Sequence, residues 1–142
     1  MPDPKEIVRR VTEDPWQGKV DEAVELIADE YIGHIPAAPG PFHGKAGYKE
    51  FITSYVAAFP DGKITVDDQI AEGDKVATRW TARGTHDGDL MDIAPTGKQV
   101  EISGLTISRL ANGKVVEGYV NWDTFGMMQQ LGVVPELAYA HA

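Results

Sequence analysis

One short stretch, EGYVNWDTFG at residues 117–126, holds the residues best suited to acid/base chemistry. Its pattern is that of a strand, in which side chains alternate between two faces. One face carries the mixed set Val115, Glu117, Tyr119, Asn121 and Asp123, and the other carries Val116, Gly118, Val120 and Trp122. A carboxylate in an apolar cavity has a raised pKa and can remove a proton from an activated carbon. Alternation does not show which face is inside, so the mixed face is either a solvated edge or a pocket wall.

Asp123 has a second interpretation. It precedes TFGMMQQLG, which we expect to form the last helix. A carboxylate beside a helix N-terminus is stabilised by the helix dipole. Capping and catalysis are compatible roles, and the residue pattern leaves both open.

Three histidines are further candidates for contact with a substrate. His34 and His43 bracket a proline-rich loop, and His86 ends a predicted strand on the face that carries Trp80. A histidine titrates near neutral pH and can orient or polarise a substrate, although each one alone could equally bond the backbone. Their spacing matches no metal-binding motif such as HExxH, so we predict no metal site.

Arg79 and Arg83 alternate with Thr81 on the opposite face of that strand. This pattern suggests a solvated outer face or a subunit contact, whereas an arginine beside two carboxylates could activate an epoxide. The chain lacks the GxSxG, P-loop and Rossmann motifs. Carboxylates and histidines therefore remain as the candidate bases and nucleophiles.

Three helices are predicted in the first part of the chain. Asp3-Pro4 is a typical N-cap and first helical residue, and this helix ends at Asp14-Pro15. A second helix is predicted over residues 20–28, and the β-rich stretch YIGHIP follows it. The third begins at Gly44 and ends before Pro60, with an apolar side made of Tyr48, Phe51, Ile52, Tyr55, Val56 and Phe59.

After Pro60 the pattern changes to the period of strands. Residues 63–86 read as two strands joined by a turn at 72–74, and a loop leads to a strand over 99–110. Asn112-Gly113 predicts a hairpin turn into the stretch that holds Asp123. Gly132 is expected to end the last helix in a left-handed conformation. Helices followed by an antiparallel meander predict an α+β fold, in which a strongly curved sheet closed by helices encloses a pocket.

Composition restricts the class of protein and its partners. The chain has 142 residues with 42% hydrophobic and 25% charged side chains, which predicts one globular domain over residues 1–142. A net charge of -9 and scattered basic residues argue against a nucleic-acid partner. There is no cysteine, no apolar signal core at the N-terminus and no stretch long enough for a membrane span. We therefore expect a cytoplasmic protein without a membrane partner.

Three longer phrases resemble a known family. YIGHIPAAPGPFHGKAGYKEF, AAFPDGKITVDDQIAEGDKVATRWTARGTHDGDL and APTGKQVEISGLTISRLANGKVVEGYVNWDTFGMMQQLG resemble the SnoaL-like polyketide cyclases, or ester cyclases, of the NTF2-like superfamily. The resemblance covers roughly residues 20–134. It implies a cone of helices around a curved antiparallel sheet with a central pocket, assembled as dimers or tetramers. It also implies ring closure of a polyketide by an intramolecular aldol condensation, with no metal or cofactor.

The resemblance also assigns roles to residues. By position, Asp123 is the general acid/base at the end of the last long strand, and its face is expected to look into the cavity. We predict a small, largely apolar carbonyl substrate, bound by His34, Phe42, Trp80, His86, Tyr119 and Asn121. Many relatives read Glu-His-Trp-Asp where this chain has Glu117-Gly118-Tyr119-Val120, so a histidine and a second acid are missing. An epoxide-hydrolase-like enzyme and a non-catalytic ligand-binding oligomer are the alternatives.

Overall fold

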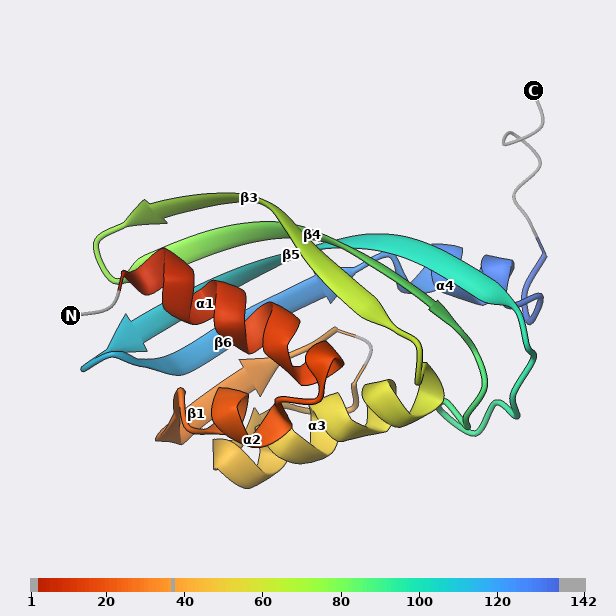
Figure 1. Ribbon diagram of the computed structural model, residues 1–142, viewed down its shortest axis with the longest axis horizontal. Coiled ribbons are helices and arrows are strands. Elements are labelled where there is room, and N and C mark those ends of the chain that lie inside the picture. The colour runs from red at the N-terminus through yellow and green to blue at the C-terminus, as the bar shows by residue number, and fades with distance from the viewer. Residues whose placement is uncertain (1–2, 37, 136–142) are drawn as a thin grey trace.

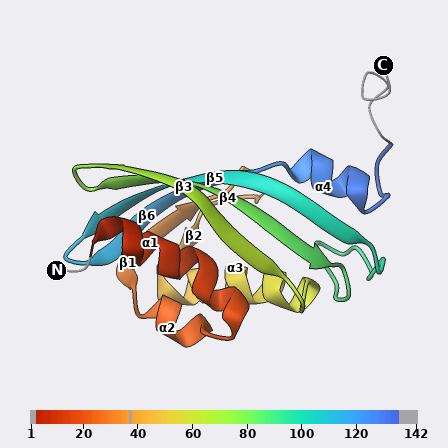
Figure 2. The same cartoon turned by 45° about the horizontal axis from the view of Figure 1, so that its top comes forward.

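A curved six-stranded sheet arches over the helical segments of the first part of the chain in the computed structural model, which describes residues 3–36 and 38–135 (Figures 1 and 2). The helical elements are α1 (Pro4–Glu13), the 3-10 helix η1 (Asp14–Gln17), α2 (Val20–Val24), α3 (Gly44–Ala58) and α4 (Thr124–Gln130). The strands are β1 (Ile27–His34), β2 (Phe42–His43), β3 (Lys63–Glu72), β4 (Lys75–Thr85), β5 (Gln99–Ala111) and β6 (Lys114–Trp122). The predicted α+β fold is confirmed.

The strand order is β2-β1-β6-β5-β4-β3. All neighbouring strands are antiparallel except β1 and β6, which run parallel. The sheet is therefore mixed at this pair, and its edges β2 and β3 do not meet. The predicted meander corresponds to β3–β6.

The start of the chain follows the predicted capping pattern. The Asp3 carboxylate accepts a hydrogen bond from the Lys5 backbone N–H at 2.9 Å, and Pro4 is the first helical residue of α1. Ile7 and Val8 are buried on the side of α1 that faces the sheet. Pro15 opens the tight turn η1, which ends at Gly18 with a positive φ of 80°. These residues hold α1 and η1 against the concave face of the sheet.

The second helix is shorter than predicted. It ends at Val24, and residues 27 and 28 already belong to β1. The backbone N–H of Val115 donates to the Leu26 carbonyl at 2.9 Å, and Ile27 pairs with Val115. Sheet pairing with β6 thus overrides the local helical periodicity of residues 25–28.

Two hairpins have the predicted turn chemistry. Gly73 has a φ of 59°, and Asn112 and Gly113 have φ angles of 53° and 77°. Positive φ values at both central residues suit the turn that joins β5 to β6. Gly132, with a φ of 80°, follows α4 in the predicted left-handed conformation.

The apolar core lies between the concave face of the sheet and the helices. One buried cluster joins α1, β1 and α3 through Ile7, Val8, Tyr31 and Tyr48. A second cluster joins the end of α3 to α4 and includes Phe59, Leu90, Met127 and Leu131. No helix in the described ranges is long and apolar enough to span a membrane.

Candidate functional site

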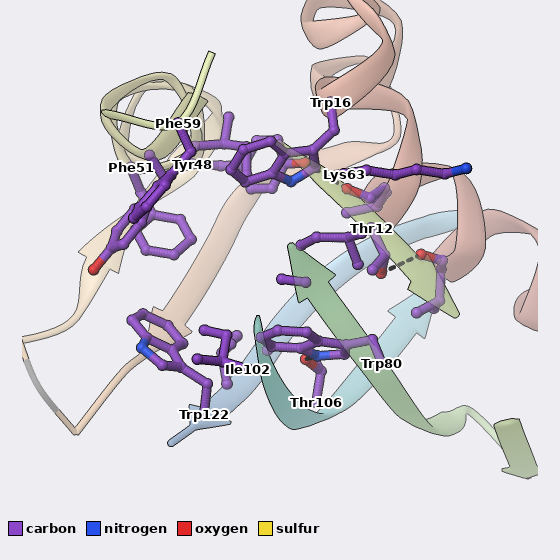
Figure 3. Close-up of a pocket in the computed structure, with 18 of the residues that line it drawn as sticks. Thr12, Trp16, Tyr48, Phe51, Phe59, Lys63, Trp80, Ile102, Thr106 and Trp122 are labelled. Atoms are coloured by element: carbon purple, nitrogen blue, oxygen red, sulfur yellow. Dashed lines mark hydrogen bonds between the residues drawn. The ribbon is translucent and has the colours of Figure 1, made fainter. Parts of the chain in front are cut away.

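A cavity of about 140 Å³ lies between the concave face of the sheet and the helices α1 and α3 (Figure 3). Aromatic side chains dominate its wall. They come from η1, α3, β4 and β6 and include Trp16, Phe51, Tyr55, Phe59, Trp80 and Trp122. Ligand sites of proteins are typically of this concave, mainly apolar kind.

The apolar face of β6 lines this cavity. Gly118, Val120 and Trp122 border it, whereas Tyr119 and Asn121 lie on the opposite face and are exposed. Val115 of the mixed set also lines the cavity, but its polar members Glu117, Tyr119, Asn121 and Asp123 do not, so the expectation that they look into the cavity is wrong. Burying the apolar set stabilises the fold by about 25 cal/mol per Å². Burying Glu117 and Asn121 would instead have required a partner for each lost contact with water.

Several polar groups at the wall are bonded to the protein. The Thr12 hydroxyl donates to the Val8 carbonyl at 2.8 Å, and the Tyr48 hydroxyl donates to the Val11 carbonyl at 2.9 Å. Trp80 Nε1 donates to Thr106 Oγ1 at 3.0 Å. These bonds occupy the donors of Thr12, Tyr48 and Trp80.

The ionisable groups that border the cavity are neutral or point outward. Burial raises the pKa of Tyr55 to about 12 and also raises the pKa of Tyr31, so both phenols stay protonated at neutral pH. Arg83 borders the cavity, but its guanidinium pairs with Glu101 and its side chain is 62% exposed. Among the described residues, no carboxylate and no histidine lines the cavity. The arrangement suits a neutral ligand.

Asp123 lies outside the lining and caps α4. It is exposed, and its Oδ1 accepts the Gly126 backbone N–H at 2.8 Å. A Cβ atom at Gly126 would lie 2.0 Å from Asp123 Oδ2, so a glycine is needed there for this contact. The capping interpretation is confirmed. In sequence, Asp123 stands between two residues that do line the cavity, Trp122 and Met127.

Glu117 is the centre of a polar cluster on the outer face of the sheet. Its Oε2 lies 3.0 Å from His34 Nε2 and accepts the Tyr119 hydroxyl at 3.2 Å, and its Oε1 accepts Arg109 Nε at 3.4 Å. The hydrogen bond with His34, followed by those from Tyr119 and Arg109, lowers the pKa of Glu117. The bond to Glu117 raises the pKa of Tyr119. The rings of His34 and Tyr119 stack at 4.4 Å.

Three predicted substrate-binding residues meet beside this cluster, but not in the cavity. His34, Tyr119 and Asn121 border a shallow hollow on the outer face, together with the proline-rich loop after β1. They share this hollow because His34 pairs with Tyr119 across the parallel strands β1 and β6. Trp80 is the member of the predicted set that lines the cavity.

Residues 6–131 match the family model of the SnoaL-like polyketide cyclases. The chain belongs to this family. Aklanonic acid methyl ester cyclase DnrD of Streptomyces peucetius is 27% identical over 134 residues, which are 89% of each chain. The crystal structure of IdmH from Streptomyces antibioticus has a TM-score of 0.80 and 33% identity, over 92% of this chain and 99% of that chain. A SnoaL-like protein from Jannaschia sp. CCS1 has a TM-score of 0.84 at 23% identity, which supports the fold alone.

Phe42 and His86 lie behind the walls of this SnoaL-like cavity. Phe42 stacks on Phe51 with ring centroids 4.9 Å apart and is absent from the lining. His86 is fully buried, and its Nδ1 accepts the Thr96 backbone N–H at 3.2 Å. This bond fixes the loop between β4 and β5 and gives His86 a structural role.

The two arginines of the epoxide alternative lie on the outer face. Arg79 pairs with Asp67 at 3.5 Å, Arg83 pairs with Glu101, and both arginine side chains are more than half exposed. Arg79 is absent from the cavity lining, and Arg83 borders the cavity without an acid in its described wall, so the geometry does not support arginine-assisted epoxide hydrolysis in this SnoaL-like protein. Within the ranges 3–36 and 38–135, no group of three or more potential metal ligands converges.

Sequence reasoning missed Trp16. It lies in DPWQG, between a proline that ends a helix and a glycine that ends a turn. Those neighbours indicate that Trp16 is held in a tight turn, which is the only available signal. They do not show that the turn folds under the sheet of the SnoaL-like cone.

Proposed function

We propose that this SnoaL-like protein is a cofactor-independent cyclase-type enzyme acting on a small, neutral, largely apolar carbonyl compound held in the aromatic cavity. The observation that carries the proposal is the cavity itself, whose wall is mainly aromatic and aliphatic and has no carboxylate or histidine among the described residues. Its two cationic residues, Lys63 and Arg83, are exposed to solvent. Similarity to the cyclase DnrD supports ring closure as the reaction class. An apolar cavity of about 150 Å³ is known to bind benzene, so one aromatic ring suits the volume.

The proposed reaction is an intramolecular aldol condensation. A base removes a proton from the carbon next to one carbonyl, and the resulting enolate carbon attacks a second carbonyl of the same molecule. One carbon–carbon bond forms, and the alkoxide oxygen takes a proton back, so the aldol product is an isomer of the substrate. No oxidant or reductant is consumed.

Asp123 is the proposed general acid/base. Its carboxylate follows Trp122, a residue of the cavity wall, and it is exposed at the start of α4. The reacting carbon of the substrate must therefore project from the cavity toward the end of β6. The Gly126 N–H that Asp123 accepts also orients the carboxylate.

Asp123→Asn tests this assignment, because asparagine still caps a helix but cannot take the proton. With a one-ring aromatic 1,5-diketone as the substrate, we expect turnover to fall at least about 100-fold. Formation of the isomeric product is followed by chromatography with mass detection. Asp87→Asn, at an exposed aspartate outside the cavity wall, is the matched control and should keep the wild-type rate. Equal rates for Asp123→Asn and the wild type would refute the role of Asp123.

A second candidate function is binding without conversion. The exposed position of Asp123 and the absence of a carboxylate or histidine from the described cavity wall favour it. In that case the wild type binds such ketones and leaves them unchanged over many hours. If the wild type converts the ketone and the Asp87→Asn variant converts it at the same rate, binding without conversion is excluded.

A further inference from the structure

All three tryptophans of the chain contribute to the cavity wall, and their ring N–H groups differ in their bonding. Trp80 Nε1 donates to Thr106 Oγ1. Trp16 Nε1 and Trp122 Nε1 are buried, and neither has an acceptor in the described part of the chain. A buried donor without an acceptor is costly in a folded protein and calls for an explanation.

The directions of the two unpaired donors separate them. In Figure 3 the Trp16 nitrogen is on the ring edge that faces Trp80 and Ile102 across the cavity. The Trp122 nitrogen is on the edge of its ring turned away from Trp80 and Ile102. Trp16 is therefore the donor directed at the space that a ligand would occupy.

The backbone holds the Trp16 ring in a defined position. Trp16 lies in η1, between buried Pro15 and Gly18. Its ring packs on Gly62, where an added Cβ would lie 2.3 Å from Trp16 Cζ3. A donor fixed in this way needs little reorganisation when it bonds a ligand.

The chemistry of the donor selects the ligand group. An indole N–H donates and cannot accept, so its partner must carry a lone pair. The cavity wall offers this group no carboxylate, and no acceptor in the described part of the chain, the Thr12 and Tyr48 hydroxyl oxygens included, accepts a hydrogen bond from it. A carbonyl oxygen on a planar, uncharged molecule meets these conditions, since the rest of such a molecule can pack against the aromatic wall.

We propose that Trp16 anchors the substrate by donating its ring N–H to a carbonyl oxygen in the cavity. This inference deepens the proposed function and rests on the cavity being the ligand site. If the anchored carbonyl is the one that forms the enolate, the same N–H stabilises the negative charge that develops on its oxygen. Trp16 then determines which carbonyl of the substrate becomes the enolate.

Two probes of nearly equal shape test the anchor. Acetophenone has a carbonyl group where α-methylstyrene has a C=CH2 group. With protein labelled with 15N at its tryptophans, we follow the three ring N–H resonances, assigned from single Trp→Phe variants. We expect acetophenone to bind on the order of tenfold more tightly than α-methylstyrene, the usual contribution of one hydrogen bond. Only acetophenone should move the Trp16 ring N–H proton resonance downfield. The Trp80 resonance should not shift in this way, because its N–H already donates to Thr106.

Trp16→Phe removes the donor and keeps an aromatic ring. We expect this variant to bind the two probes with equal affinity and to retain its affinity for α-methylstyrene. Trp122→Phe is the matched control, because it removes an unpaired N–H that faces away, and it should keep the preference for acetophenone. If Trp16→Phe fails to fold, the wild-type titration alone decides.

Several outcomes would overturn the proposal. They are equal binding of both probes by the wild type, no binding of either probe, a Trp16 resonance unmoved by acetophenone, or a preference that survives in Trp16→Phe. The titration measures binding without turnover. A loss of cyclase activity in the proposed reaction would thus leave the anchor intact, and failure of the anchor would leave the Asp123 assay unaffected.

Discussion

Glu117 has three side-chain hydrogen-bond partners, and it lies on the face opposite to the cavity. Its three hydrogen-bonding neighbours come from β1, β5 and β6. It therefore ties the three strands together on the outer face. The Glu117 carboxylate therefore has a structural position outside the cavity of this SnoaL-like protein.

Glu117 makes the stability of the protein depend on pH. Folding lowers the pKa of Glu117. Its ionised form therefore stabilises the fold above the ordinary carboxyl pKa of about 4.3, and this contribution is lost as the pH falls through the lowered value. We expect Glu117→Gln to have a lower urea midpoint than the wild type at pH 7, and the difference to disappear at an acid pH below the lowered pKa. The exposed Glu50→Gln variant serves as the control. A difference of the same size at both pH values would contradict the role given to the carboxylate.

Single residues show where sequence reasoning succeeds and where it stops. The capping roles of Asp3 and Asp123 were predictable because a cap depends on neighbours in the chain. The inward direction of Trp16 was not, because the wall opposite it comes from strands far along the chain. Which face of β6 lies inward could not be predicted for the same reason, since alternation defines two faces without showing which one meets the helices.

At the scale of elements, the close contact between β4 and β5 positions the cavity wall. Trp80 and Gly104 are partners across these strands. A Cβ atom at Gly104 would lie 2.3 Å from Trp80 Cζ2, so the indole lies over the bare backbone of β5. The missing side chain on one strand thus makes room for the aromatic wall on the next.

Gly104→Ala should therefore destabilise the protein by roughly 1–3 kcal/mol, the usual cost of overpacking. Gly104 does not have a positive φ, so the expected effect is steric and not conformational. Urea unfolding measures the change. Gly40→Ala is the control, because an added Cβ there meets nothing within 4 Å, and it should change stability by less than about 0.5 kcal/mol. Wild-type stability of Gly104→Ala would show that Trp80 is free to move.

Hairpins were the elements most fully predictable from the sequence. Gly73 and Asn112-Gly113 mark turns that the local chain alone determines. The end of α2 was not predictable, because residues 25–28 keep a helical pattern and become extended only through pairing with β6. The parallel pairing of β1 with β6 also leaves no local signal in the sequence.

At the scale of the molecule, the outer face of the sheet carries large apolar side chains that are exposed to solvent. Leu105, Ile107 and Tyr119 are 58%, 49% and 49% exposed. Ile107 pairs with Tyr119, and Leu105 lies two residues away on the same face of β5. We propose that two copies of the chain associate through this outer-face patch.

Leu105→Glu should convert such a homo-oligomer into a monomer, because association would bury the new charge. Size-exclusion chromatography with light scattering should give the monomer mass of 15.5 kDa for the variant and at least twice that mass for the wild type. Val133→Glu, 44% exposed and outside the sheet, is the control and should behave as the wild type. A monomeric wild type, or a Leu105→Glu variant of unchanged mass, would refute an interface at the outer-face patch.

The parallel contact between β1 and β6 also affects the order of folding. His34 and Glu117, which bond across it, are 83 positions apart in the chain. The strands β3, β4, β5 and β6 are joined consecutively and can pair locally, but β1 must wait until β6 has been synthesised. Closing so long a loop costs chain entropy, and non-local pairing of this kind slows folding. We therefore expect the side of the cavity wall that β1 supplies, with Ile27 and Tyr31, to form only after β6 is in place.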